Sequence, residues 1–229
     1  MGECRCQICA FRATPSVPVA RYNLYQMDFL DTLSIAISDR RLTGEACMRR
    51  VKNNAKTMLF KRGFTSVFFF GDGDDVLVGK DNKNRAKADI TVHFCKAPKA
   101  TTKCVREIVE DESFNFSKKK IIVTLFGSTT TKNEKFFSES VQHLTYFFLI
   151  NDVTEHVLVP RHELVSEEEQ DAICKKYASA SKHLVDFPIL LKTDPVSQFL
   201  GFEKGDLVRI HRKSFGGFSE SVCFFRRVS

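Results

Sequence analysis

Three short apolar runs in the first two thirds of the chain most constrain what it can fold into. They span residues 67–70, 90–94 and 121–126 and are rich in valine, isoleucine and phenylalanine. Runs of this length between polar segments are typical of strands, because the helices of globular proteins are usually longer. Residues 90–94 alternate apolar and polar, whereas residues 121–126 are continuously β-favouring and should be buried on both faces. The runs predict a small, partly buried sheet.

Two helices are predicted from mostly apolar stripes, whose residues recur every three or four positions. The first stripe consists of Tyr22, Gln26, Phe29, Leu33 and Ile37, and the second of Phe137, Val141 and Leu144. The second stripe leads into another apolar stretch at residues 146–150, and a polar stretch rich in arginine and lysine precedes the first strand. Residues 1–19 include Pro15 and Pro18 and show no period, so we expect a flexible leader there.

The last third of the chain is more clearly punctuated. Ser166 begins a capping box in which its hydroxyl accepts from the third amide of a helix and Glu169 reaches back to the cap. This pattern predicts a helix over residues 167–177. Strands are expected at residues 207–211, which alternate apolar and polar, and at residues 222–225, with a glycine pair between them.

The net charge of +7 is unevenly spread. Up to residue 150 there are 24 Lys and Arg against 16 Asp and Glu, a net charge of +8; from residue 151 there are 11 against 12, a net charge of −1. Basic residues that neutralise phosphates release condensed counterions and gain affinity without reading sequence. The first half therefore suggests a nearby polyanion, the alternative being a solvated basic surface.

The sequence also bears on the cellular compartment. Its 229 residues contain no run of about 18 apolar residues, which is the length that a membrane helix needs. The first six residues lack the apolar segment of a secretory signal. We therefore expect a cytosolic or nuclear protein without a membrane anchor, whose eight scattered cysteines are reduced.

Three clusters contain residue types that bind metal ions in other proteins. They are Cys4, Cys6 and Cys9; His156 and His162 beside Glu155 and Glu163; and Asp72, Asp74 and Asp75. The cysteines lack a fourth ligand for structural zinc, the histidines lack the H-E-x-x-H spacing, and the aspartates lack the rest of a calcium loop. We predict no metal, no cofactor and no catalytic residue.

Four motifs follow one another in the last third. Residues 154–162 read T-E-H-V-L-V-P-R-H, Pro188 follows a phenylalanine, residues 193–196 read T-D-P-V, and residues 201–210 read G-F-E-K-G-D-L-V-R-I. The ordered set resembles the C-terminal module of the common fifth subunit of eukaryotic nuclear RNA polymerases. That family carries T-E-H-x-L-V-P-x-H, L-P-x-I, D-P-x-x-R-Y and G-x-x-x-G-x-x-V-K-I at nearly these spacings. The match over the first two thirds is weaker.

The resemblance implies an α+β fold with two modules. An N-terminal α/β jaw domain with a mixed sheet would span residues 20–150, and a small C-terminal α/β assembly domain would span residues 151–229. In the family, the assembly domain docks on the largest subunit and the jaw approaches downstream duplex DNA. The implied assembly residues are Thr154, Glu155, His156, Pro160, His162, Pro188, Asp194, Pro195, Phe199, Gly201, Gly205 and Val208. The two glycines bracket a tight connection where a positive φ is expected.

This chain departs from the family pattern at several positions. Gln198 stands for Arg, Phe199 for Tyr, Glu203 for a common Lys and His211 for a common Ile. A reversed charge at a protein contact changes the choice of partner more readily than the fold. The sequence resembles a divergent member or paralogue, of the kind found in kinetoplastids, which keep separate copies for different polymerases.

The candidate DNA contacts are basic residues near predicted strand ends. They are Arg85, Lys87, Lys118, Lys119 and Lys120. Side chains that neutralise the DNA backbone position a protein without reading its sequence, so a few lysines suffice. The ordinary alternative is that these lysines are only solvated.

The resemblance thus implies a non-catalytic subunit of a DNA-directed RNA polymerase, located in the nucleus, or in the nucleolus if it serves polymerase I. Its partners would be the largest and other polymerase subunits, with downstream duplex DNA as a further contact and no obligate homo-oligomer. Two alternatives are a free-standing nucleic-acid-binding regulator and a metal-dependent nuclease built on the jaw, for which Asp72, Asp89 and the lysines near Lys118 would be the site. No E-x-K sequence follows the relevant aspartate, which speaks against the nuclease.

Overall fold

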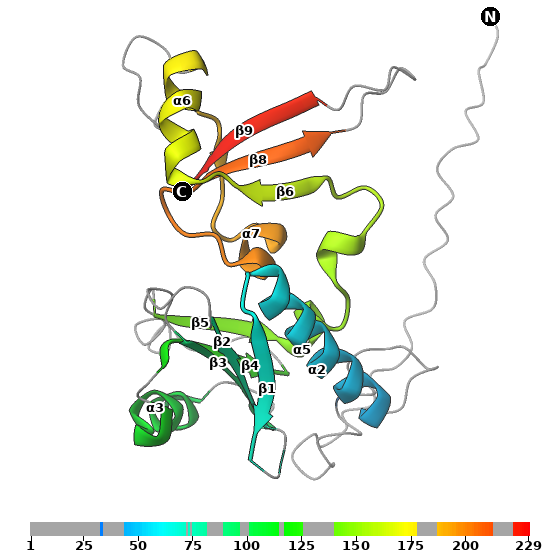
Figure 1. Cartoon of the computed structure of the whole chain (residues 1–229). Helices are drawn as coiled ribbons and strands as arrows, with labels where there is room; N and C mark the ends of the chain where they lie inside the picture. Colours follow the sequence, from blue (N-terminus) through cyan, green and yellow to red (C-terminus); the bar gives the residue numbers. More distant parts are fainter. Residues whose placement is uncertain are drawn as a thin grey trace, which may run out of the picture.

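The computed structural model describes Leu33 and residues 44–71, 73, 75–81, 89–96, 101–114, 117–125, 140–177, 187–212 and 222–229. In this part of the chain two sheets lie one above the other in the view of Figure 1, with the short helix α7 (Pro195–Leu200) between them. The predicted α+β class is confirmed. None of the helices in these residues combines the length and the apolarity needed to span a bilayer.

The first sheet is mixed and has five strands. In spatial order they are β1 (Ser66–Phe70), β2 (Val76–Lys80), β3 (Asp89–Phe94), β4 (Ser117–Thr124) and β5 (Val141–Thr145). The first three strands pair antiparallel and the last three pair parallel. The strands predicted at residues 67–70, 90–94 and 121–126 are confirmed as β1, β3 and β4, although residue 126 lies outside the described residues.

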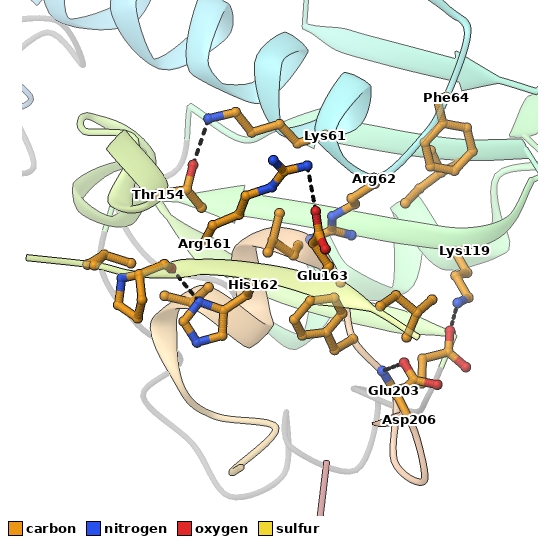
Figure 2. A pocket seen from close by; sticks show the side chains of 18 of the residues that line it. Lys61, Arg62, Phe64, Lys119, Thr154, Arg161, His162, Glu163, Glu203 and Asp206 are labelled. Atoms are coloured by element: carbon orange, nitrogen blue, oxygen red, sulfur yellow. Dashed lines mark hydrogen bonds and ion pairs between the residues drawn. The ribbon is translucent and has the colours of Figure 1, made fainter. Parts of the chain in front are cut away.

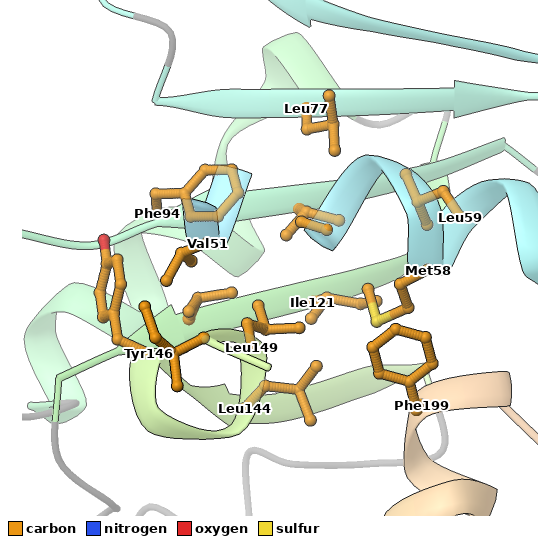
Figure 3. Packing of buried hydrophobic residues seen from close by; sticks show 14 of the residues in the cluster. Val51, Met58, Leu59, Leu77, Phe94, Ile121, Leu144, Tyr146, Leu149 and Phe199 are labelled. Atoms are coloured by element: carbon orange, nitrogen blue, oxygen red, sulfur yellow. The ribbon is translucent and has the colours of Figure 1, made fainter. Parts of the chain in front are cut away.

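Helix α2 (Gly44–Lys61) covers one face of this sheet and builds the main core (Figure 3). Its fully buried residues are Cys47, Val51, Ala55, Met58 and Leu59. They recur at helical spacing within the stretch that was expected only to be polar, so an apolar stripe was overlooked there. The predicted helix at residues 22–37 lies outside the described residues except for Leu33, which is helical and buried in the same core.

Helix α3 (Thr102–Glu110) and the 3₁₀ turn η1 (Glu112–Phe114) cover the opposite face. Ile121 of β4 packs in the core with α2, whereas its neighbour Ile122 packs with Val105 of α3. Successive side chains of a strand point to opposite faces, so β4 is buried on both sides, as its continuous apolar run predicted.

The second sheet has four strands and two small cores. Their order is β6 (Arg161–Leu164), β8 (Leu207–Arg212), β9 (Val222–Val228) and β7 (Ile189–Leu190). Helix α6 (Glu167–Tyr177) packs Ile173 and Cys174 against one face, through Leu207. On the other face Val208 and Ile210 pack with Phe202, and this face looks toward α7 and the first sheet (Figure 1).

The helix predicted from Phe137, Val141 and Leu144 is wrong in its described part. Residues from Val141 to Thr145 form β5, which pairs parallel to β4, and the helix α5 (Tyr146–Leu149) follows where only an apolar stretch was expected. Val141 and Leu144 are both buried. They face the two opposite cores, because a spacing of three places residues on opposite faces of a strand and on one face of a helix.

The start of α6 confirms half of the predicted capping box. The Glu169 amide donates to Ser166 Oγ at 3.3 Å. The Glu169 carboxylate does not reach back to the cap as expected, because it pairs with Arg209 Nη2 of β8 at 3.1 Å. The helix bounds agree with the predicted residues 167–177.

The positive φ predicted for two glycines is confirmed, at 73° for Gly201 and 100° for Gly205. Nothing lies within 4 Å of a Cβ placed on Gly205, so its substitution tests the backbone conformation alone. We expect Gly205→Val to lower the free energy of unfolding by about 1–3 kcal/mol, measured by urea denaturation. Gly205→Asn should cost less, because asparagine tolerates this conformation. Equal stability of the valine variant and the parent chain would contradict the prediction.

Candidate functional site

Three of the four motifs of the last third, all but the one at Pro188, contribute to a groove between the two sheets (Figure 2). Its volume is about 1350 Å³. One wall comes from β6, α7 and the segment that follows α7, and the other comes from the end of α2 and the start of β4. The predicted assembly residues that line it are Thr154, Glu155, Pro160, His162 and Gly201.

The first motif begins at a 3₁₀ turn, η2 (Val153–Glu155), which is tied to the end of α2. Lys61 Nζ donates to Thr154 Oγ1 at 2.6 Å, to Glu155 Oε1 at 2.5 Å and to Asp152 Oδ2 at 2.9 Å. Partial burial by itself would lower the pKa of Lys61, but the hydrogen bonds to Glu155 and Asp152 outweigh it and raise the pKa. Thr154 and Glu155 therefore anchor the second module to the first.

The turn that follows exposes two apolar side chains. The Leu158 amide donates to His156 Nδ1 at 3.2 Å, and the Val159 amide donates to the His156 carbonyl at 2.8 Å. These bonds fix the turn while Val157 and Leu158 remain 91% and 82% exposed. Paired apolar residues held outward on a fixed turn are typical of a protein contact rather than of a fold determinant. Neither residue was predicted from the sequence to be a contact.

The two histidines of the motif have separate structural roles. His156 closes the exposed turn, whereas His162 Nδ1 donates to the Pro160 carbonyl at 2.7 Å. Burial lowers the pKa of His162 even though the bond to Pro160 opposes this shift. Among the residues that the structure describes, no group of three His, Cys, Asp or Glu side chains is arranged to hold a metal ion. The three cysteines of the leader, Asp72 and Asp74 lie outside the described residues.

The second motif forms α7. Asp194 caps it, because its Oδ1 accepts from the Val196 amide at 2.8 Å, and Pro195 occupies the first turn. Phe199 is fully buried in the core of the first sheet (Figure 3). Its ring centre lies 6.3 Å from that of Phe148. The side chain of Phe199 thus joins the two modules of this chain, and its role in assembly with other subunits stays a prediction.

Arg62 fastens the end of α7 to the first sheet. Its Nη2 donates to the Gln198 carbonyl at 2.7 Å and its Nε donates to the Phe199 carbonyl at 3.0 Å. Gly201 ends the helix, and a Cβ there would lie 2.9 Å from Arg62 Nε. Burial lowers the pKa of Arg62 to about 10, so the guanidinium stays charged at neutral pH. The close approach explains a glycine at this position beyond its positive φ.

The remaining motif residues position the backbone of the second sheet. The Pro188 carbonyl accepts from the Arg227 amide at 2.9 Å, and the Gly205 amide donates to the Val228 carbonyl at 3.0 Å. Val208 is fully buried. Most of the predicted assembly residues thus support the module itself, and their effect on a partner stays a prediction.

Glu203 and His211, two of the residues that depart from the family pattern, both contact other residues of this chain. Glu203 forms an ion pair with Lys119 of β4, so its negative charge joins the two modules. His211 Nε2 lies 2.7 Å from Glu163 Oε2 on the neighbouring strand. Their expected role in partner choice stays a prediction, since both side chains have partners here.

The lysines at the start of β4 lie in different environments. Lys120 is only 7% exposed, and its Nζ donates to the carbonyls of Ile108 and Val109 at 3.0 Å and 2.9 Å. Its predicted place at the surface is therefore corrected, because the ammonium caps the end of α3. Lys119 faces the groove. The side chain of Lys118, and the whole of Arg85 and Lys87, lie outside what the structure describes.

A second basic surface was not predicted from the sequence. Arg49, Lys52 and Lys56 share one side of α2, at spacings of three and four. The Nζ atoms of Lys52 and Lys56 lie 5.3 Å and 4.5 Å from the centre of the Phe69 ring on β1. The helical period within the Arg- and Lys-rich stretch was the signal that could have revealed this surface.

Lys120 also helps to keep a buried histidine neutral. His93 contacts Thr91 Oγ1 through Nε2 at 3.0 Å and lies edge-on to the Phe114 ring. Burial, with a smaller contribution from Lys120, lowers the pKa of His93 to about 4. The folded chain therefore binds this proton only near pH 4, whereas the unfolded chain binds it near the ordinary value of 6.5.

This difference predicts a loss of stability in acid. The free energy of unfolding should fall by on the order of 3 kcal/mol between pH 6.5 and pH 4, because the unfolded state takes up the extra proton. Urea denaturation across this range should give a flatter profile for His93→Gln than for the parent chain. A smaller slope should remain, because burial also lowers the pKa of His143 and His162. Identical slopes for the two proteins would contradict the assignment.

The chain is also similar in sequence to known proteins. The family model described as RNA polymerase Rpb5, C-terminal domain, matches residues 151–228. The chain is 45% identical over 62 residues to DNA-directed RNA polymerase subunit Rpo5 of Methanocaldococcus jannaschii, covering 27% of this chain and 76% of the relative. Against Rpo5 of Pyrococcus abyssi it is 40% identical over 63 residues, 28% of this chain and 73% of the relative.

A longer similarity reaches into the first two thirds. The chain is 26% identical over 161 residues to DNA-directed RNA polymerases IV and V subunit 5B of Arabidopsis thaliana, covering 69% of this chain and 72% of the relative. The archaeal proteins align over about the length of the second module, whereas the plant protein aligns over more than twice as many residues.

Proposed function

The chain belongs to the Rpb5 family of RNA polymerase subunits and is a subunit of a DNA-directed RNA polymerase; we propose that it has no active site of its own, that its second module docks on the largest subunit and that its first module faces downstream DNA. We place it in the nucleus, or in the nucleolus if it serves polymerase I. Its partners are then the other polymerase subunits, and it need not pair with a second copy.

The observation that carries the docking proposal is the exposed apolar turn. Val157 and Leu158 project from a turn that His156 closes, and Lys61 holds the preceding residues against the first module. Burying two such side chains in a partner gains about 1.5–3 kcal/mol for each. The turn belongs to the first motif of the matched region.

Co-purification with a tagged chain tests this proposal. The double variant V157S/L158S should fold normally yet recover at least tenfold less of the large polymerase subunits, because it loses apolar contact area. Leu191→Ser is the matched control, since Leu191 is 60% exposed at another place on the same module. Full recovery with the double variant, or equal loss with the control, would place the docking surface elsewhere.

The proposed DNA contact is supported by the basic side of α2 and by Lys119. Arg49, Lys52 and Lys56 form a continuous row on the module that carries the charge excess. Such a row can neutralise successive phosphates, and the resulting affinity falls with salt. Lys119 is a weaker candidate because Glu203 already pairs with it.

Charge reversal tests this contact in the assembled enzyme. The variant K52E/K56E should retain DNA less well at low salt and reduce the salt dependence of log Kd by about 1 for each lost contact. The control K175E/K176E makes the same charge change on α6, where Lys176 also lies over an aromatic ring, at 5.0 Å from Tyr177. Unchanged DNA retention by K52E/K56E at every salt concentration would remove this row from the interface.

A further inference from the structure

Strand β6 is an edge strand of the second sheet in the described part of the chain. Its register pairs His162 with Ile210 and Leu164 with Val208 of β8. The Val165 amide donates to the Leu207 carbonyl at 2.9 Å, which fixes the hydrogen-bonded positions of this antiparallel pair. Because these positions alternate, the amides and carbonyls of His162 and Leu164 point away from β8.

The groove runs along this outer edge. All four residues of β6 line it, together with Pro160 before the strand (Figure 2). Leu164 is 57% exposed. Its cross-strand neighbour Val208 is fully buried, so the apolar surface of the sheet continues outward onto Leu164 and stops at the groove. An edge with outward amides beside apolar side chains has the features to which an added strand binds.

The charges of the groove are balanced within the chain. Lys61 pairs with Glu155, Lys119 pairs with Glu203, and Arg161 pairs with Glu163. The guanidinium of Arg62 is bound to backbone carbonyls, and the carboxylate of Asp206 accepts from the Glu203 amide at 2.7 Å. A charged occupant would therefore have to separate an existing pair, whereas an uncharged segment would leave all of them in place.

We infer that β6 accepts an extended, uncharged segment of another polymerase subunit as an added strand. The segment takes its backbone bonds from His162 and Leu164 and places an apolar side chain against Leu164. This inference rests on the proposed docking function and gives it a second, backbone-mediated contact. The first module closes the far side of the groove with α2 and β4, which favours a single extended chain over the sheet edge of a second folded copy.

Cross-linking locates the occupant directly. A photoreactive amino acid at position 164 of the tagged full chain should cross-link to another polymerase subunit within the purified enzyme. The same amino acid at Tyr177, which is 56% exposed on α6, serves as the control and should give less of that product. A cross-link to a second copy of the chain, or no cross-link in fully assembled enzyme, would overturn the inference. If the parent chain does not enter the polymerase at all, the proposed function fails instead.

A pair of substitutions tests the backbone bonds. Proline at position 164 removes an amide that faces outward, which an edge strand tolerates, whereas alanine removes only the side chain. The variant L164P should enter the polymerase roughly threefold to tenfold less than L164A, the effect expected for one lost hydrogen bond. Equal incorporation of two variants with the same thermal stability would show that no strand is added. If L164P does not fold, the cross-linking result decides.

Discussion

Replacing Phe199 with alanine should destabilise the chain by about 3–5 kcal/mol, because it leaves a large cavity between the two modules. Phe199 comes from α7 of the second module but is fully buried in the core of the first sheet, beside Phe148. The loss should appear as a lower urea midpoint, and the first sheet should lose stability together with the second. Polymerase incorporation should fall only as far as the amount of folded chain falls.

Leu158→Ala is the control for this experiment. Leu158 is 82% exposed, so its truncation should change the free energy of unfolding by less than about 0.5 kcal/mol. It should nevertheless lower incorporation, if the exposed turn is the docking contact. A Phe199 variant that is as stable as the parent chain but fails to assemble would return Phe199 to the interface.

The strands of the first sheet were predicted from the sequence more accurately than the helices that cover the sheet. The runs that became β1, β3 and β4 are short and uniformly β-favouring, so their length alone separated them from helices. Val141 and Leu144 are different, because a spacing of three fits one face of a helix and also two faces of a strand buried on both sides. Only the parallel pairing with β4 distinguishes these alternatives, and this pairing is a long-range property.

In the candidate site, too, features set by neighbouring residues could be predicted from the sequence, whereas features set by distant residues could not. The motif order predicted the second module, the cap at Asp194 follows from local chemistry, and the positive φ of Gly201 was expected from its turn. Phe199 is buried among residues far away in the sequence, and Arg62, also distant, holds the end of α7 through two carbonyls. A sequence motif identifies such residues, but it does not distinguish those that contact a partner from those that stabilise the module.

Reversing the charge of Lys120 should destabilise the chain by about 3–5 kcal/mol, whereas the same change at the neighbouring Lys119 should cost far less. Lys120 is only 7% exposed, and its ammonium donates to the carbonyls of Ile108 and Val109 near the end of α3. A glutamate would bring a carboxylate toward those same oxygens and leave them without a donor. Lys119 is about half exposed, and in its variant a like-charge contact in partly solvated surroundings replaces the ion pair with Glu203.

Lys120→Met separates the effect of a negative charge at this position from the effect of losing the hydrogen-bond donor. Methionine keeps the apolar length of the side chain but supplies no donor, so the cost should be about 1–3 kcal/mol. Because Lys120 contributes to the low pKa of His93, this pKa should rise in the methionine variant, as an NMR titration of the ring would report. If Lys120→Glu folds as stably as Lys119→Glu and the His93 titration stays unchanged, then the ammonium of Lys120 lies in solvent and is again a candidate for the DNA backbone.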